Sequence, residues 1–188
     1  MFERGFKSWC EKLSLEFRAK LGLEPIDPLP ARDLATHLGI QVRTTAEFSA
    51  LSPSSQSILD GDDAWSAVTL EGSDKKLIIL KATNTPGRQS SDLMHELSHH
   101  LLDHRPTPVD VSKEGLLMLH SYDRTHEAQA DWLSSCLLLP RPALMLIKTR
   151  RDEESAAAQA YGVSIAMLKY RLDVSGINVQ AARRQKMT

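Results

Sequence analysis

Two histidines four residues apart, with a glutamate directly after the first, restrict the fold of this chain more than any other feature. The stretch reads His95-Glu96-Leu97-Ser98-His99. Imidazoles at this spacing share one side of a helix, where side chains at i and i+4 lie about 5–6 Å apart. At about 100° per residue, Leu93, Leu97 and Leu101 fall on the opposite side. The pattern therefore predicts a helix with an apolar face packed on a core and a polar face carrying a site.

The polar face has the composition of a catalytic metal site. Imidazole nitrogens bind Zn2+ at about 2.0–2.1 Å, and a catalytic zinc site combines three protein ligands with one open position. Glu96 lies at the edge of the face, where it can act as a base without being a ligand. The alternative is an ordinary helix with two incidental histidines. Residues 90–104 contain no lysine or arginine, which a solvated helix would normally carry, so the metal interpretation is favoured.

A second stretch supplies candidates for the third ligand. Glu127 and Asp131 are one helical turn apart in a helix predicted over 124–139. The arrangement resembles the gluzincin zinc peptidases, which implies that Glu127 is the third ligand and that Asp131 hydrogen-bonds a ligand histidine. The alternative is that Glu127 and Asp131 form a solvated acidic face of the helix and bind no metal. His120 and Tyr122, in the connection before this helix, are candidates for stabilising an oxyanion or assisting proton transfer.

The remaining pattern predicts a mostly helical α+β fold. We expect a zincin-like arrangement with a small three-stranded sheet beside the motif helix and a C-terminal helical hairpin. Strand 76–81 is the candidate edge strand, and the motif helix is expected to start at Ser90 or Ser91. Residues 1–148 are expected to form the metallopeptidase domain and 149–188 a helix-turn-helix-like segment packed on it. The other helices are predicted at 6–21, 30–38, 152–161 and 164–173, and the other strands at 40–44 and 65–70.

Bulk composition places the function in a local site. The chain has 188 residues and a net charge of -1, so no overall field attracts it to nucleic acid or to an anionic membrane. Cys10 and Cys136 lie in apolar, helix-like surroundings and are predicted to be free, buried thiols. We find no signal pattern and no apolar run of membrane-spanning length. These observations predict a cytoplasmic protein with no membrane partner.

Taken together, the segments resemble the ImmA/IrrE metallopeptidases. They are PLPARDLATHLGIQV at 28–42, the histidine motif, EAQADWLSSCLLLP at 127–140 and a Gly-Val-Ser segment at 162–164. The resemblance implies that His95, His99 and Glu127 hold zinc, that Glu96 is the base, and that the substrate is a helix-turn-helix repressor. The family commonly has Gly in place of Ser98 and Phe-Ala in place of residues 132–133, which affects pocket shape rather than the ligands.

These observations predict a zinc-dependent endopeptidase that cuts a helix-turn-helix transcriptional repressor at a specific site. The segment Leu116–Leu119 and the C-terminal segment are candidate docking surfaces for that substrate. One alternative is a DNA-binding regulator that uses Lys169 and Arg171, although sparse basic residues predict only weak or indirect contact with nucleic acid. The other is a catalytically idle zinc-containing partner in a toxin–antitoxin, phage or mobile-element regulatory pair. Glu96 argues against that, since a structural zinc site needs no base.

Overall fold

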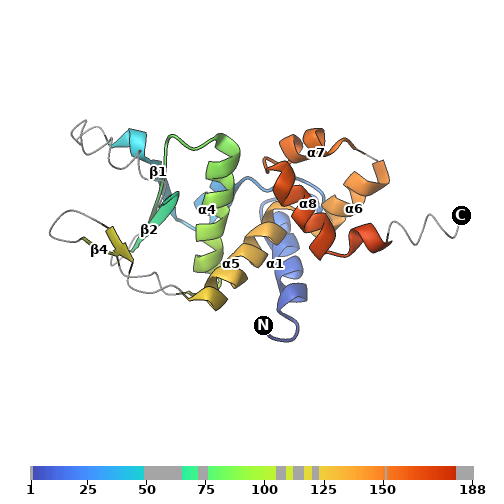
Figure 1. Ribbon diagram of the computed structural model, residues 1–188, viewed down its shortest axis with the longest axis horizontal. Coiled ribbons are helices and arrows are strands. Elements are labelled where there is room, and N and C mark those ends of the chain that lie inside the picture. The colour runs from blue at the N-terminus through green and yellow to red at the C-terminus, as the bar shows by residue number, and fades with distance from the viewer. Residues whose placement is uncertain are drawn as a thin grey trace, which may run out of the picture.

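The protein is an α+β molecule in which long helices separate a small sheet from a group of short C-terminal helices (Figure 1). The computed structural model describes residues 2–48, 65–71, 76–104, 109–111, 117–119, 123–150 and 152–180. Helices α4 and α5 lie between the sheet on one side and α6–α8 on the other. The elements are α1 (Phe6–Lys20), α2 (Ala31–His37), β1 (Gln41–Thr44), the 3-10 helix η1 (Thr45–Glu47), β2 (Ala67–Glu71), β3 (Lys76–Leu80), α4 (Pro86–Leu101), β4 (Val109–Val111), β5 (Leu117–Leu119), α5 (Arg124–Leu138), α6 (Arg141–Arg150), α7 (Glu154–Ala160) and α8 (Ile165–Val174).

The three-stranded sheet confirms the predicted fold class but not the predicted position of one strand. Its order is β1-β3-β2, with β1 parallel and β2 antiparallel to β3. The prediction that strand 76–81 forms the edge is therefore wrong, because β3 pairs with β2 on one side and with β1 on the other. Ile78 and Leu80 are each 1% exposed, as a central strand requires. Among the described strands, β1 and β2 are the two edges of this sheet.

Helix α4 starts earlier than the sequence predicted. It begins at Pro86, and the hydroxyl of Thr85 caps it by accepting the Arg88 N–H at 3.3 Å. Proline suits the first helical position because it lacks an N–H that would need a partner, so the expected start at Ser90 or Ser91 is wrong. The helix ends at Leu101, and Asp103 then adopts a left-handed conformation with φ 54°.

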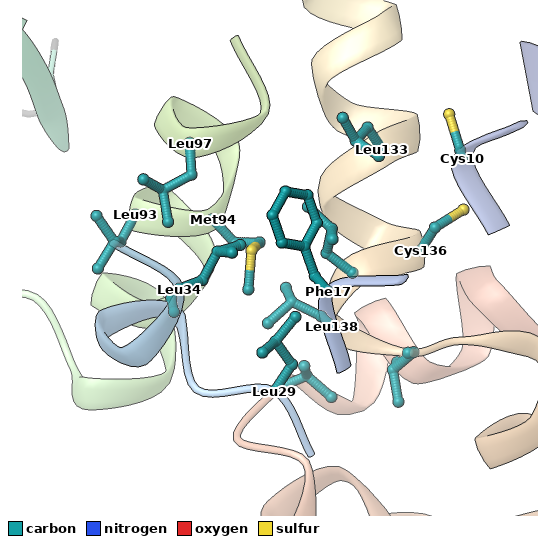
Figure 2. Packing of buried hydrophobic residues seen from close by; sticks show 14 of the residues in the cluster. Cys10, Phe17, Leu29, Leu34, Leu93, Met94, Leu97, Leu133, Cys136 and Leu138 are labelled. Atoms are coloured by element: carbon teal, nitrogen blue, oxygen red, sulfur yellow. The ribbon is translucent and has the colours of Figure 1, made fainter. Parts of the chain in front are cut away.

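The apolar face predicted for the motif helix is buried. Leu93, Met94 and Leu97 are each at most 1% exposed and belong to the same hydrophobic cluster as Phe17 of α1 and Leu133 of α5, with Met94 beside the Phe17 ring (Figure 2). Burial of a leucine-sized side chain contributes about 1.5–3 kcal/mol. The core thus fixes the rotation of α4 and turns its other face toward the start of α5.

Both cysteines are free and buried in this core, as predicted. Cys10 comes from α1 and Cys136 from α5 (Figure 2). Burial raises the pKa of the Cys10 thiol to about 12 and raises that of Cys136 as well. The two thiols are therefore protonated at neutral pH and act as packing residues.

Two fully buried arginines hold the C-terminal end of α5. Arg18 donates to the carbonyl oxygen of Leu137 at 2.8 Å, and Arg171 donates to that of Leu139 at 2.9 Å. The last carbonyls of a helix have no partner within the helix and carry partial negative charge. Glu11 of α1 balances one of the cations, with Oε1 2.6 Å from Arg171 Nη2. The cluster joins α1, α5 and α8.

The C-terminal helices pack on the same core. Gly162, with φ 64°, separates α7 from α8, and Leu168 and Leu172 of α8 belong to the main hydrophobic cluster. Helix α6, which the sequence did not predict, spans the proposed boundary at residues 148–149, so the two-part division stays a prediction. No single described helix is long and apolar enough to cross a membrane, although α5 and α6 taken together, with a 52° bend, meet the test of length and composition.

Part of the connection after α4 is structured. Strands β4 and β5 form a separate antiparallel pair within what the sequence indicated as an irregular connection. Leu116 of the proposed docking patch and residues 181–188 of the predicted C-terminal segment lie outside the described residues.

Candidate metal centre

Three predicted ligands converge where α4 meets the first turn of α5. The Nε2 atoms of His95 and His99 are 3.0 Å apart. Glu127 places Oε2 3.2 Å from His95 Nε2 and Oε1 3.5 Å from His99 Nε2. One ligand atom from each residue lies within 4.8 Å of the others. The three side chains are 21–29% exposed, so the cluster is open to solvent on one side.

These distances suit one tetrahedrally coordinated ion. Ligand atoms at about 2.0–2.1 Å from such an ion lie about 3.3–3.4 Å from each other. The two Nε2 atoms, 3.0 Å apart, and the pair His95 Nε2 and Glu127 Oε2, 3.2 Å apart, are close to that value, and the other carboxylate oxygen of Glu127 lies 3.5 Å from His99 Nε2. Two imidazoles and one carboxylate are also a donor set typical of catalytic zinc sites. The cluster of His95, His99 and Glu127 can therefore hold a metal ion.

The start of α5 is fixed by a cap that positions Glu127. The carboxylate of Asp123 accepts the N–H groups of Thr125 at 2.8 Å and His126 at 3.3 Å. Capping of this kind stabilises a helix by about 1 kcal/mol. Ala130, which is fully buried, adds no bulk on this face of α5. The cap and the small residue bring the first turn of α5 against α4.

Asp131 lies against the ring of the first histidine, as the gluzincin resemblance implied. Its Oδ1 is 3.0 Å from His95 Nδ1, and its side chain is 68% exposed. Burial lowers the pKa of His95, but the hydrogen bond and charge of Asp131, with the charges of Glu96 and Glu127, outweigh burial and raise it overall. An N–H donated from Nδ1 leaves the Nε2 lone pair directed at the metal position.

Glu96 lies outside the ligand cluster and contacts β2, one of the two edge strands. Its Oε2 accepts a hydrogen bond from the hydroxyl of Thr69 on β2. Burial raises the pKa of the Glu96 carboxyl, while the Thr69 bond and the charge of His95 oppose that effect. Sequence reasoning missed Thr69. The signal that could have pointed to it is a hydroxyl residue in the middle of an otherwise apolar strand near the motif helix.

The second ligand histidine contacts another histidine instead of a carboxylate. His104 Nδ1 is 3.1 Å from His99 Nδ1, and His104 Nε2 is 3.0 Å from Gln129 Oε1. The ring of His126 stacks on that of His104, with centroids 4.1 Å apart and an interplanar angle of 15°. No site role was predicted from the sequence for His104, His126 or Gln129.

Ser98 and Trp132, which differ from the expected family pattern, are next to site residues in the sequence but are not part of the ligand cluster. Ser98 is fully buried and donates its hydroxyl to the Met94 carbonyl oxygen at 2.8 Å. Trp132 faces the start of α1, where Lys7 Nζ lies 3.9 Å from its ring centroid. The two candidates for oxyanion stabilisation, His120 and Tyr122, lie outside the described residues and stay predictions.

Comparisons with known proteins agree with this geometry. The family model of the IrrE N-terminal-like domain, Peptidase_M78, matches residues 35–173, a range that contains His95, Glu96, His99 and Glu127. A solved structure described as a Mycobacterium tuberculosis transcriptional regulator is similar to this chain, with a TM-score of 0.53 and 14% identity. The match covers 91% of this chain but 47% of that one, so the chain spans about half its length, and the likeness concerns the fold. A comparison with curated proteins found no significant match.

Proposed function

Since the chain belongs to the ImmA/IrrE metallopeptidase family, Peptidase_M78, through its IrrE N-terminal-like domain, we propose that it is a zinc-dependent endopeptidase. The observation that carries the proposal is the three-ligand cluster with Glu96 beside it and outside it. A structural zinc site normally takes four protein ligands and needs no base. A cluster of three ligands with a neighbouring carboxylate is the arrangement expected for hydrolysis.

In the proposed reaction the three ligands hold the ion and Glu96 moves the proton. Zinc, when bound by His95, His99 and Glu127, supplies a Lewis acid that polarises a carbonyl and makes water more acidic. Glu96 accepts a proton from the attacking water and transfers it to the amide nitrogen as the peptide bond breaks. Asp131 keeps the ring of His95 in the orientation that binding requires.

The outer edge of β2, which pairs with no other strand among the residues that the structure describes, is the candidate surface for the substrate backbone. Lys81 donates its N–H to the Ser66 carbonyl oxygen at 3.0 Å, which makes that pair a hydrogen-bonded one. Because such pairs alternate along an antiparallel ladder, Thr69 belongs to a pair that is not hydrogen-bonded, so its N–H and C=O point away from β3. An extended peptide paired with this edge would lie next to Glu96, the β-strand addition mode of peptide binding.

We further propose that the substrate is a helix-turn-helix repressor and that the cellular role is regulation of transcription. This rests on the family resemblance, and it is in keeping with the similar solved structure, which is described as a transcriptional regulator. Selectivity for one protein requires docking outside the cleft, with Leu116–Leu119 and the C-terminal segment as the proposed surfaces. General digestion of proteins would need neither.

The test compares wild type with Glu96→Gln on two substrates. Glu96→Gln should retain one zinc per chain, measured by elemental analysis, and should lose cleavage, because an amide cannot accept the proton. Glu16→Gln, on the outer side of α1, is the matched control and should keep both properties. Casein and a purified helix-turn-helix repressor from the same genome serve as substrates, with fragments identified by mass spectrometry. Loss of zinc from Glu96→Gln, or equal cutting of casein and repressor, would contradict the proposal.

The alternative of DNA binding through the α7–α8 hairpin has less support. Arg171 is fully buried and pairs with Glu11, so it is not available to a phosphate. Lys169 lies 3.3 Å from Glu154, which offsets its charge. A gel shift with the operator DNA of that repressor over a range of salt concentrations distinguishes this alternative, since phosphate binding weakens steeply as salt rises.

A further inference from the structure

The ring of His99 has two nitrogens, and each faces a different environment. Nε2 faces His95 and Glu127 and is the atom available to a metal. Nδ1 faces His104, just beyond the end of α4. Only a nitrogen without a proton can bind a metal, so the proton of a neutral His99 must lie on Nδ1. Something must therefore accept a hydrogen bond from that Nδ1–H.

A chain of acceptors meets this requirement. Gln129 presents Oε1 to His104 Nε2 at 3.0 Å, and an amide oxygen only accepts, so Nε2 of His104 carries the proton. The other nitrogen of neutral His104, Nδ1, is then free to accept from His99 Nδ1–H at 3.1 Å. If Gln129 presented its NH2 group instead, each proton would shift along the chain. His99 would then direct an N–H at the metal position.

The surroundings hold His104 in place. The left-handed turn at Asp103 brings the chain back, so that the His104 N–H donates to the His99 carbonyl oxygen at 3.0 Å. The His126 ring covers one face of the His104 ring. Gln129 and His126 of α5 both contact His104. The series of hydrogen bonds therefore joins α4 and α5, the two helices that carry the ligands.

We propose that His104 is a positioning residue for the metal site, holding His99 in the tautomer that binds metal, and that Gln129 sets the direction of the proton chain. The proposal deepens the proposed zinc site and rests on His99 being a ligand. The two histidine ligands are then oriented by different chemistry, His95 by the Asp131 carboxylate and His99 by a neutral imidazole.

Four variants separate hydrogen bonding from packing. His104→Phe keeps a ring against His126 but removes both hydrogen bonds, whereas His104→Asn can place an amide oxygen near the Nδ1 position. Gln129→Glu can only accept, so it preserves the direction of the chain, whereas Gln129→Met removes the acceptor at similar size. We expect His104→Phe to bind zinc about 10–100-fold more weakly, the usual cost of losing a partner of a ligand histidine. His104→Asn and Gln129→Glu should stay close to wild type, and Gln129→Met should weaken binding.

Zinc affinity is measured by competition with a chromogenic chelator, and Co2+ spectra report the coordination of each variant. Circular dichroism of the metal-free proteins checks that each variant is folded. Long-range 1H–15N NMR of metal-free wild type at pH 8 reads the tautomers directly and should place the His99 proton on Nδ1 and the His104 proton on Nε2. The opposite tautomers would overturn the inference whatever the metal affinity. Equal zinc affinity in His104→Phe and wild type would also overturn it, and so would equal losses of zinc affinity in Gln129→Glu and Gln129→Met. Failure of wild type to bind zinc at all would instead refute the proposed function.

Discussion

Replacement of Glu11 by alanine should destabilise the protein far more than the same replacement of Glu16, which lies about one and a half turns further along α1. Glu11 Oε1 lies 2.6 Å from Arg171 Nη2, and the Arg171 side chain is 0% exposed. Its other oxygen accepts the Arg141 N–H at 3.0 Å. Glu11→Ala therefore leaves a buried cation without its anion, a change that costs about 3–5 kcal/mol. For a domain of this size, each kcal/mol lowers Tm by about 2–4 °C, so the expected loss is roughly 6–20 °C.

Glu16→Ala is the matched control. Glu16 lies 3.6 Å from Lys12, but their side chains are 46% and 78% exposed, and such surface pairs contribute about 0–1 kcal/mol. Urea unfolding of the metal-free proteins, followed by circular dichroism, gives both free energies. If the two variants differ by less than about 1 kcal/mol, the assignment of Glu11 as the necessary counter-charge of Arg171 is wrong.

Two further predictions concern the site. Glu127→Ala should nearly abolish zinc binding while Asp131→Ala weakens it by about 10–100-fold, as ranked by chelator titration; the reverse order would mean that the wrong acid has been assigned as ligand. Because burial raises the pKa of Glu96 and the Thr69 hydroxyl opposes that rise, activity on the cognate repressor should fall as pH falls through this pKa, and Thr69→Val should move that acidic limb to higher pH. Bound zinc affects wild type and Thr69→Val alike, so the measurement is the difference between their pH profiles. Superimposable profiles would exclude a role of Thr69 in lowering the pKa of Glu96.

The part of the site that could be predicted follows from helical periodicity. Spacing alone places His95 and His99 on one face, and one turn separates Glu127 from Asp131 in the same way. The packing of α4 and α5, which brings the two pairs together, depends on apolar faces that the sequence also displays. Residue spacing and apolar faces both follow from the regular repeat of a helix, so they can be predicted from the sequence.

Thr69, His104 and Gln129 were missed because their roles do not follow from helical periodicity. Each acts through a contact between elements that are distant in sequence or separated by a turn, such as the 27-residue separation of Thr69 and Glu96. The order of the sheet was missed because β3 is central only through its pairing with β1, which lies more than thirty residues earlier in the sequence. The early start of α4 was missed because a Pro-Gly pair is typical of turns, whereas here Pro86 follows a capping threonine.

Helix α5 carries Glu127 in its first turn and ends on the carbonyls that Arg18 and Arg171 hold. Its 15 residues correspond to a rod about 22 Å long. A helix held at its C-terminal end resists sliding and rotation, so the position of Glu127 depends partly on a buried cluster at the other end of α5. Substitutions of Arg18 and Arg171 therefore belong in any search for variants with altered metal affinity.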